Sequence, residues 1–257
     1  MRLRWSLNLA GNADQQFVSH ESCNGTGRDV CSLRQDERHL LLPDEGCALF
    51  TVTFPCVEQW VVGAEWAALG DDMVLRRMRE EGAAEHDLRL QTTFLGCLYL
   101  HGDQRIIKDV ARTTWEATGT PDLVDTKYVK NVRGRLEKYA GHQRRIDRVR
   151  FLLKRDGFLR SDNGSRRDFF GRKDALPTVQ EALAWNPRAM VAYVTGLAWR
   201  RLVAMDGLKV PLVTPPTLWV QCAKETKEAT RAMLEAFTVV VAVAGQQLKL
   251  KPTYEPV

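Results

Sequence analysis

Histidine and cysteine side chains that could hold a metal ion fall together near the start of the chain, at His20, Cys23, Cys31 and His39. The gap between the first two residues suits zinc, but the stretch between the two cysteines is wider than usual zinc-finger spacing. The 6 cysteines include no CxxC pair. We therefore favour ordinary reduced thiols over a zinc site, and we predict neither a bound metal nor a cofactor.

Positive charge is concentrated in one segment that could contact phosphates. Residues 127–173 contain 16 lysines and arginines against 5 acidic residues, a surplus of 11 positive charges, whereas the whole chain carries a net charge of +5. The rest of the chain is therefore acidic, with a net charge of −6. A basic segment in an acidic chain favours a nucleic-acid partner, although a solvated helix face gives the same pattern.

The segment 210-VPLVTPPTLWVQ-221 predicts a β-hairpin, because two runs rich in Val and Leu flank a proline-containing turn. Pro215 and Pro216 form the tip of this turn, between Thr214 and Thr217. None of these four side chains can bind a metal strongly, carry a charge or take a proton. The pattern therefore predicts a well-formed hairpin whose tip has no evident chemistry.

Hydrophobic periodicity predicts the elements that surround this hairpin. A strand is expected over 47–54 and, after Pro55, a helix over 56–69. Further helices are predicted, in chain order, over most of 72–117 with breaks near Gly82 and Gly102, over 127–141 with Gly141 ending the helix, over 143–155, over 179–205 as a buried central helix, and over 223–237. A hairpin around Asn163-Gly164 and a β-rich tail complete an α+β layout.

The composition is that of a globular protein, with 44% apolar and 27% charged residues. A chain of 257 residues is long enough for a full hydrophobic core. No apolar run approaches the roughly 20 residues that a membrane span needs, and the N-terminal apolar stretch is too broken for a signal peptide. We therefore expect a soluble intracellular protein with no membrane partner, in the cytoplasm, a phage-infected cell or an organelle matrix.

In this order the elements resemble the palm and fingers of family A DNA polymerases, the bacterial DNA polymerase I-like enzymes, including phage members. The resemblance rests on six segments in family order: NGTGRDVCSLR from Asn24, 42-LPDEGCALFTVTFPCVEQW-60, 85-EHDLRLQTTFLG-96, 127-KYVKNVRGRLEKYAG-141, 164-GSRRDFFGRKDALPTVQEALAWNPRAMVAYVTGLAWRRL-202 and the hairpin 210–221. It implies an antiparallel palm sheet with packed helices, and helical fingers. The N-terminal part of the palm would span 1–70, the fingers-like region 71–160 and the C-terminal part of the palm 161–257, with no thumb or exonuclease domain.

The resemblance also implies where the chemistry of such enzymes would lie. Their nucleotide transfer uses two divalent ions, held chiefly by one Asp from the first motif and one from the hairpin. Here Thr53 falls at the first Asp, and Pro215, Pro216 and Thr217 fall on the hairpin's His-Asp-Glu. Both metal-binding carboxylates are absent. Of the first motif, only Glu58 remains, at the place where the family checks the sugar.

Other family positions have changed as well. The fingers helix should present an Arg and a Lys four positions apart, but one of these two cations is missing in either possible register. The Gln of the central helix that touches the duplex is replaced, and so is the Gln-Asn pair after Gly-Thr-Gly. The fingers-helix pair falls on Lys127 and Asn131, or on Thr126 and Lys130 in the other register. The Gln of the central helix falls on Arg188, and the Gln-Asn pair falls on Cys31 and Ser32. Three other acids, Asp71, Asp72 and Glu225, lie beyond the elements that would form the site.

The leading hypothesis is a catalytically inactive polymerase-like protein that acts as a nucleic-acid-binding or scaffold subunit, with contacts to the backbone of DNA or RNA. Tyr139 could stack on a base, but a packed tyrosine is the favoured interpretation. The residues assigned to nucleic-acid binding are Lys127, Lys130, Arg133, Arg135, Lys138, Tyr139, Arg144, Arg145, Arg148, Arg166, Arg167, Arg172 and Arg188.

Two alternatives stay open. The chain could be a structural subunit of a large ribonucleoprotein or replication assembly, without nucleic-acid binding of its own. It could also be one subunit of a split active DNA polymerase, whose partner supplies the missing carboxylates. Other protein subunits are expected as partners under each of these hypotheses.

Overall fold

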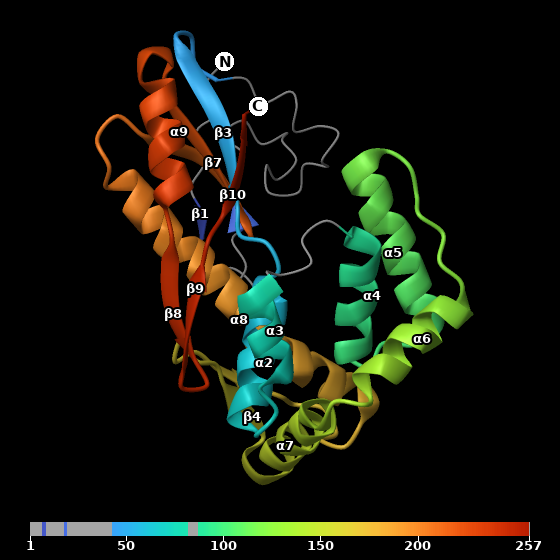
Figure 1. Ribbon diagram of the computed structural model, residues 1–257. Helices are drawn as coiled ribbons and strands as arrows, with labels where there is room; N and C mark the ends of the chain where they lie inside the picture. The colour runs from blue at the N-terminus through green and yellow to red at the C-terminus, as the bar shows by residue number, and fades with distance from the viewer. Residues whose placement is uncertain (1–6, 9–17, 20–42, 82–86, 257) are drawn as a thin grey trace. The chain divides into compact units, whose positions relative to one another are not determined.

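The computed structural model describes residues 7–8, 18–19, 43–81 and 87–256 (Figure 1). Contacts divide the chain into two units. The sheet unit comprises the described parts of Met1–Pro55, Val191–Val241 and Lys249–Val257, and the helical unit comprises the described parts of Cys56–Met190 with Ala242–Leu248. The zinc-like set His20, Cys23, Cys31 and His39 lies outside the described residues, as do Ser32 and Gly82. No helix in the described ranges is long and apolar enough to cross a membrane.

A four-stranded antiparallel sheet with the strand order β10-β3-β7-β6 forms the centre of the sheet unit. Its strands are β3 (Cys47–Thr53), β6 (Lys209–Thr214), β7 (Thr217–Ala223) and β10 (Thr253–Pro256). β3 and β10 flank one another although they lie at opposite ends of the described chain (Figure 1). β7 buries all of its five central residues, because it is an inner strand with both faces covered.

One further helix and the outer ends of a second hairpin belong to the sheet unit, whereas the turn end of that hairpin, Ala242–Leu248, belongs to the helical unit. A short 3₁₀ turn, η2 (Lys224–Thr226), leads into α9 (Lys227–Ala236), which contacts β7 and β10. β8 (Val239–Val243) pairs with β9 (Gln246–Leu250), and β8 alternates strictly between buried and exposed residues, as a half-buried strand should. Ala244 and Gly245 form the turn, both with positive φ, which is the backbone that a two-residue hairpin loop needs. Two short strands, β1 (Leu7–Asn8) and β2 (Val18–Ser19), pair with each other.

The helical unit is built from helices around a core that includes Trp66, Leu98, Ile106 and Leu153. In chain order its helices are α2 (Val57–Ala68), α3 (Met73–Glu81), α4 (Leu88–Leu98), α5 (Asp103–Thr118), α6 (Thr126–Leu136) and α7 (Ala140–Asp156). The hairpin β4 (Phe158–Arg160) and β5 (Arg166–Asp168) follows, and then the first half of α8 (Leu176–Val203), which continues into the sheet unit. α4 and α5 pack side by side (Figure 1).

The mixed α/β class and both predicted hairpins are confirmed, whereas the predicted helix over 127–141 is wrong. Two helices occupy that stretch, because α6 ends at Leu136 and α7 begins at Ala140. Gly141 therefore begins a helix instead of ending one. A Cβ atom on Gly141 would lie 2.7 Å from the Trp66 side chain. The backbone N–H of Gly141 donates to Asp71 Oδ2 at 2.8 Å. The glycine thus serves close packing at the start of α7.

Candidate functional site

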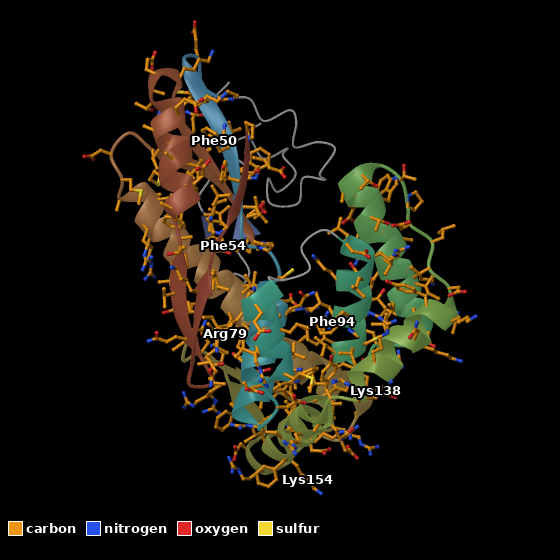
Figure 2. The ribbon with its side chains drawn as sticks, in the orientation of Figure 1. Phe50, Phe54, Arg79, Phe94, Lys138 and Lys154 are labelled. Atoms are coloured by element: carbon orange, nitrogen blue, oxygen red, sulfur yellow. The ribbon has the colours of Figure 1, made fainter. Side chains whose placement is uncertain are left out.

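Thr53 and Thr217 meet at one end of the palm-like sheet. They are directly opposite each other in the antiparallel pair of β3 and β7, and their Oγ1 atoms are 2.9 Å apart. The backbone N–H of Phe54 donates to the carbonyl of Pro216 at 3.1 Å, which ties the residue after β3 to the hairpin tip. The fold therefore brings together the positions at which the resemblance expects metal-binding carboxylates. Phe50 and Phe54 mark this part of the chain in Figure 2.

The chemistry at this meeting point is neutral. Thr53 and Thr217 offer hydroxyls, and Pro215 and Pro216 offer only backbone carbonyls. Divalent ions such as Mg²⁺ are normally held by carboxylates, usually together with water and substrate phosphates. No group of three or more His, Cys, Asp or Glu residues that could hold a metal ion occurs within the described ranges. The arrangement can therefore hold the two strands together, but it supplies no negative charge to an ion.

The other acids considered from the sequence are occupied elsewhere or exposed. Asp71 accepts from the Gly141 N–H at the start of α7, where a carboxylate also complements the helix dipole. Asp72 pairs with Arg76 at 3.0 Å, one helical turn along α3. Glu225 is exposed in η2.

Glu58 lies in the first turn of α2, in the helical unit, and accepts a hydrogen bond of 2.5 Å from the Tyr99 hydroxyl. Tyr99 is buried, and this burial, followed by the charge of Glu58, raises the pKa of the tyrosine well above its ordinary value. The Arg188 guanidinium lies 5.8 Å from the centre of the Tyr99 ring. Two family-related positions, Glu58 and Arg188, are therefore linked through a tyrosine that the sequence did not single out.

Several arginines of the basic segment are held by acids or carbonyls within the helical unit, often close to them in sequence. Their guanidinium groups are thus partly neutralised, although most of these pairs remain accessible to solvent. The contacts are Arg133 with Asp103 at 2.7 Å, Arg144 with the Leu69 carbonyl at 2.8 Å, Arg166 with Asp168 at 2.7 Å, Arg167 with Glu181, and Arg172 with Asp174 at 3.1 Å.

Arg145 lies in the core, although the sequence grouped it with the phosphate-binding cations. Its side chain is 5% exposed, and it donates to Glu65 Oε2 at 2.5 Å and to the Leu183 carbonyl at 2.6 Å. The correction has a simple reason: Arg145 falls on the inward face of α7, beside the buried Ile146. Tyr139 is also packed, with its ring centre 5.8 Å from that of Trp66.

Further assigned cations are exposed on α6, on α7 and in the turn between them, and we call this set of residues the basic face. α6 buries Val129, Val132 and Leu136 and turns its polar residues to solvent, as an amphipathic helix does. Within the described ranges these cations have no ion-pair partner. They are Lys127, Lys130, Arg135, Lys138 and Arg148. Lys138 and Lys154 are labelled in Figure 2.

Sequence reasoning missed the exposed aromatic residues that accompany this charge. Phe151, on α7, is 59% exposed and has the Arg155 guanidinium 5.1 Å from its ring centre. Phe170, after β5, is 95% exposed. The signal was available for the α7 residues, because Arg144, Arg148, Phe151 and Arg155 recur at steps of three and four and so share one face of the helix.

The antiparallel sheet, its packed helices and the helical unit define a mixed α/β protein with a polymerase-like fold. One solved structure that this chain is similar to is the POL domain of Pol1 from M. smegmatis, in complex with DNA primer-template and dNTP. The sequence identity is 11% and the TM-score is 0.62. The similarity covers 100% of this chain and 47% of the other, so the chain spans about half the length of that domain. No protein-family model and no curated protein matches the sequence.

Proposed function

We propose that this chain is a catalytically inactive, polymerase-like protein that acts through binding, as a nucleic-acid-binding or scaffold subunit. One observation carries the proposal: the Thr53 and Thr217 hydroxyls are hydrogen-bonded to each other at 2.9 Å, at the strand ends where a polymerase of this kind needs charged metal ligands. We assign 1–70 and 161–257 to the palm and 71–160 to the fingers as part of the same proposal.

The loss of charge has a direct consequence for nucleotide transfer. Two-metal catalysis stabilises the attacking and leaving oxygens through ions that the protein must hold in place. Neutral hydroxyls and proline carbonyls are poor substitutes for two carboxylates, and a threonine pair that is already hydrogen-bonded has less capacity left for a ligand. Glu58 is one carboxylate, and it accepts the Tyr99 hydroxyl.

The basic face supports binding to a nucleic-acid backbone. Its five cations have no acidic partner within the described ranges, so their charge is available to phosphates. Such contacts are sequence-independent and release counterions, which makes the affinity fall steeply as salt is added. The similar M. smegmatis domain was solved with a DNA primer-template.

A second candidate function has its own support. Arg133, Arg166 and Arg172 are paired with acids of the chain itself, which lowers the charge that the segment presents. A structural subunit that meets its partners through protein contacts would have this property. Absence of any binding to single- or double-stranded DNA or RNA at low salt would favour this function over the first.

Primer extension tests the loss of activity. The full chain is incubated with primer-template and all four dNTPs, with Mg²⁺ and separately with Mn²⁺, and we expect no extension. A conventional DNA polymerase I-like enzyme serves as the positive control. Template-dependent extension that Glu58→Gln abolishes would overturn the proposal, because it would show that the chain itself carries out nucleotide transfer.

A further inference from the structure

A cavity of about 290 Å³ opens in the helical unit and is formed by five segments of the chain. α2, α7, β4, the first half of α8 and the turn of the β8–β9 hairpin contribute to its wall. Part of the lining is apolar and includes Leu69, Val149, Leu152 and Leu159. Other lining residues are polar or charged, so the wall offers both apolar and polar groups to a ligand.

The acids that line the cavity are fully engaged. Glu65 accepts from Arg145 at 2.5 Å through Oε2, and from the side-chain amide of Asn186 at 2.8 Å through Oε1. Asp162 accepts from the same amide at 2.7 Å through Oδ2, and from the Ala244 N–H at 2.8 Å through Oδ1. All four carboxylate oxygens thus have a donor within the protein. The network fixes the shape of this part of the wall. Arg145 balances the charge of Glu65, and two neutral donors hold Asp162 in place.

Two further lining residues are arginines that, unlike the buried Arg145, are exposed to solvent. Arg148, from α7, and Arg160, from β4, are exposed, and neither has an ion pair with any acid in the described ranges. Arg160 lies 5.7 Å from the centre of the Phe158 ring, a contact that leaves its N–H donors available. The guanidinium fork of arginine matches the oxygens of phosphate and can donate two parallel hydrogen bonds.

We propose that this cavity binds a phosphate monoester carried on a small ring, with Arg148 and Arg160 contacting the phosphate and apolar lining residues contacting the ring. The volume is near the lower limit of small-molecule pockets, about 300 Å³, so the ligand is no larger than a mononucleotide. Two sources present this chemistry: a free nucleoside monophosphate, and the 5′-phosphorylated end of a nucleic-acid strand. The site is separate from the basic face except for Arg148, which borders both.

Calorimetric titration of the full chain tests the ligand class. The probes are adenosine monophosphate, adenosine and inorganic phosphate, and then a trinucleotide with and without a 5′-phosphate. We expect adenosine monophosphate to bind at least tenfold more tightly than adenosine or inorganic phosphate. If the 5′-phosphate raises trinucleotide affinity by a similar factor, the strand end is a competent source; if it does not, the free nucleotide is the ligand. No binding of adenosine monophosphate up to 10 mM overturns the proposal.

Matched substitutions locate the binding. Arg148→Ala and Arg160→Ala should each weaken adenosine monophosphate binding by about tenfold or more, because each removes a charge-assisted contact. Arg150→Ala is the control, since Arg150 is exposed two residues along α7 and does not line the cavity; its affinity should stay within about twofold. Equal loss in all three variants would show a general charge effect and reject the cavity. Rejection of the cavity proposal would not contradict the proposed nucleic-acid binding by the basic face, because binding to the backbone of a long strand requires no terminal phosphate.

Discussion

At the scale of single residues, the pair of Thr53 and Thr217 determines which side-chain chemistry is available at this end of the sheet. The β3–β7 register sets Thr53 opposite Thr217, and both side chains are neutral. In a cross-strand pair the side chains approach closely enough to interact directly. The position is therefore suited to a test in which charge is put back.

The double substitution Thr53→Asp with Thr217→Asp should create a divalent-cation site. Without metal, the two carboxylates face each other and destabilise the protein by up to about 1 kcal/mol. With Mn²⁺ at about 100 times the dissociation constant, binding to the folded state alone returns about 2.7 kcal/mol. Thermal unfolding with and without Mn²⁺ measures both effects. The wild type should show no Mn²⁺ shift, and a double variant equally unresponsive would contradict the convergence of these side chains.

The buried pair of Arg145 and Glu65 gives a second prediction at this scale. Glu65→Ala leaves the 5%-exposed Arg145 side chain without its carboxylate, and breaking a buried pair in this way costs about 3–5 kcal/mol. Urea unfolding followed by circular dichroism measures the change in unfolding free energy. Asp174→Ala, at an exposed pair with Arg172, is the control and should have no measurable effect. An equally small loss at Glu65 would mean that Arg145 reaches solvent.

At the scale of elements, the start of α7 depends on a glycine that sequence reasoning assigned to the end of a helix. Gly141→Ala should destabilise the protein by about 1–3 kcal/mol, because its Cβ would sit 2.7 Å from the buried Trp66 side chain. The same urea experiment measures it. Gly134→Ala, on α6 with open space at its Cβ position, is the control and should be neutral or slightly stabilising. A neutral result at Gly141 would contradict the close approach of α7 to α2.

His142, one residue further along α7, makes the stability of this element depend on pH. Burial, and then the charge of Arg145, lowers the pKa of His142, with Glu137 acting in the opposite direction. The unfolded chain therefore takes up a proton near pH 6.5 while the folded protein does not, so the unfolding free energy falls as the pH drops below about 6.5. His101 acts in the same direction, because burial lowers its pKa too.

Chemical denaturation from pH 7.5 to 5.0 tests this sign. His142→Gln should make the loss of stability at low pH shallower, because it removes a group that the unfolded chain protonates preferentially. His101→Gln should do the same, and the double variant should be shallower than either single variant. A pH profile unchanged by either substitution would show that these histidines are accessible to protons in the folded state.

The elements also show what the sequence could and could not predict. Both hairpins and the strand over 47–53 carry strong local signals, namely alternating apolar runs and turn residues, and they form as predicted. The division of 127–141 into α6 and α7 and the strand β10 were missed. Gly141 is explained by its contact with Trp66, and β10 by its pairing with β3 about 200 residues away. Neither partner is local in sequence, so local patterns carry no trace of them.

In the candidate site, too, features with a local sequence signal were predictable, and features that depend on distant residues were not. The motif order aligned Thr53 and Pro216 with the two metal-binding aspartates and Thr217 with the hairpin Glu. In the fold, Thr53 lies opposite Thr217, and the next residue, Phe54, is hydrogen-bonded to the Pro216 carbonyl. Charge counting found the basic segment but could not separate Lys127, which is exposed, from Arg145, which is buried. Which arginines are neutralised depends on acids such as Asp103 and Glu65, which come from other helices.

At the scale of the whole molecule, a polymerase-like fold persists at 11% identity to the similar domain. Buried positions such as Trp66, Trp185 and Val220 form the core, whereas the cations of the basic face are exposed. The proposed activity of the whole chain therefore depends on charge that lies outside the core.

The salt dependence of binding tests this dependence on charge. The full chain should bind single-stranded DNA or RNA with an affinity that falls linearly on a log–log plot against salt, with a slope of about −0.7 for each phosphate contacted. Lys127→Ala and Lys130→Ala should each lower the magnitude of the slope by about 0.7, because each removes one contact from the basic face. Lys108→Ala, exposed on α5 outside the basic segment, should leave the slope unchanged. Fluorescence anisotropy from 25 to 300 mM salt gives these slopes. Binding that ignores salt, or a loss of slope at Lys108 equal to that at Lys127, would show that the basic face does not carry the interaction and would leave the protein-scaffold function as the better account.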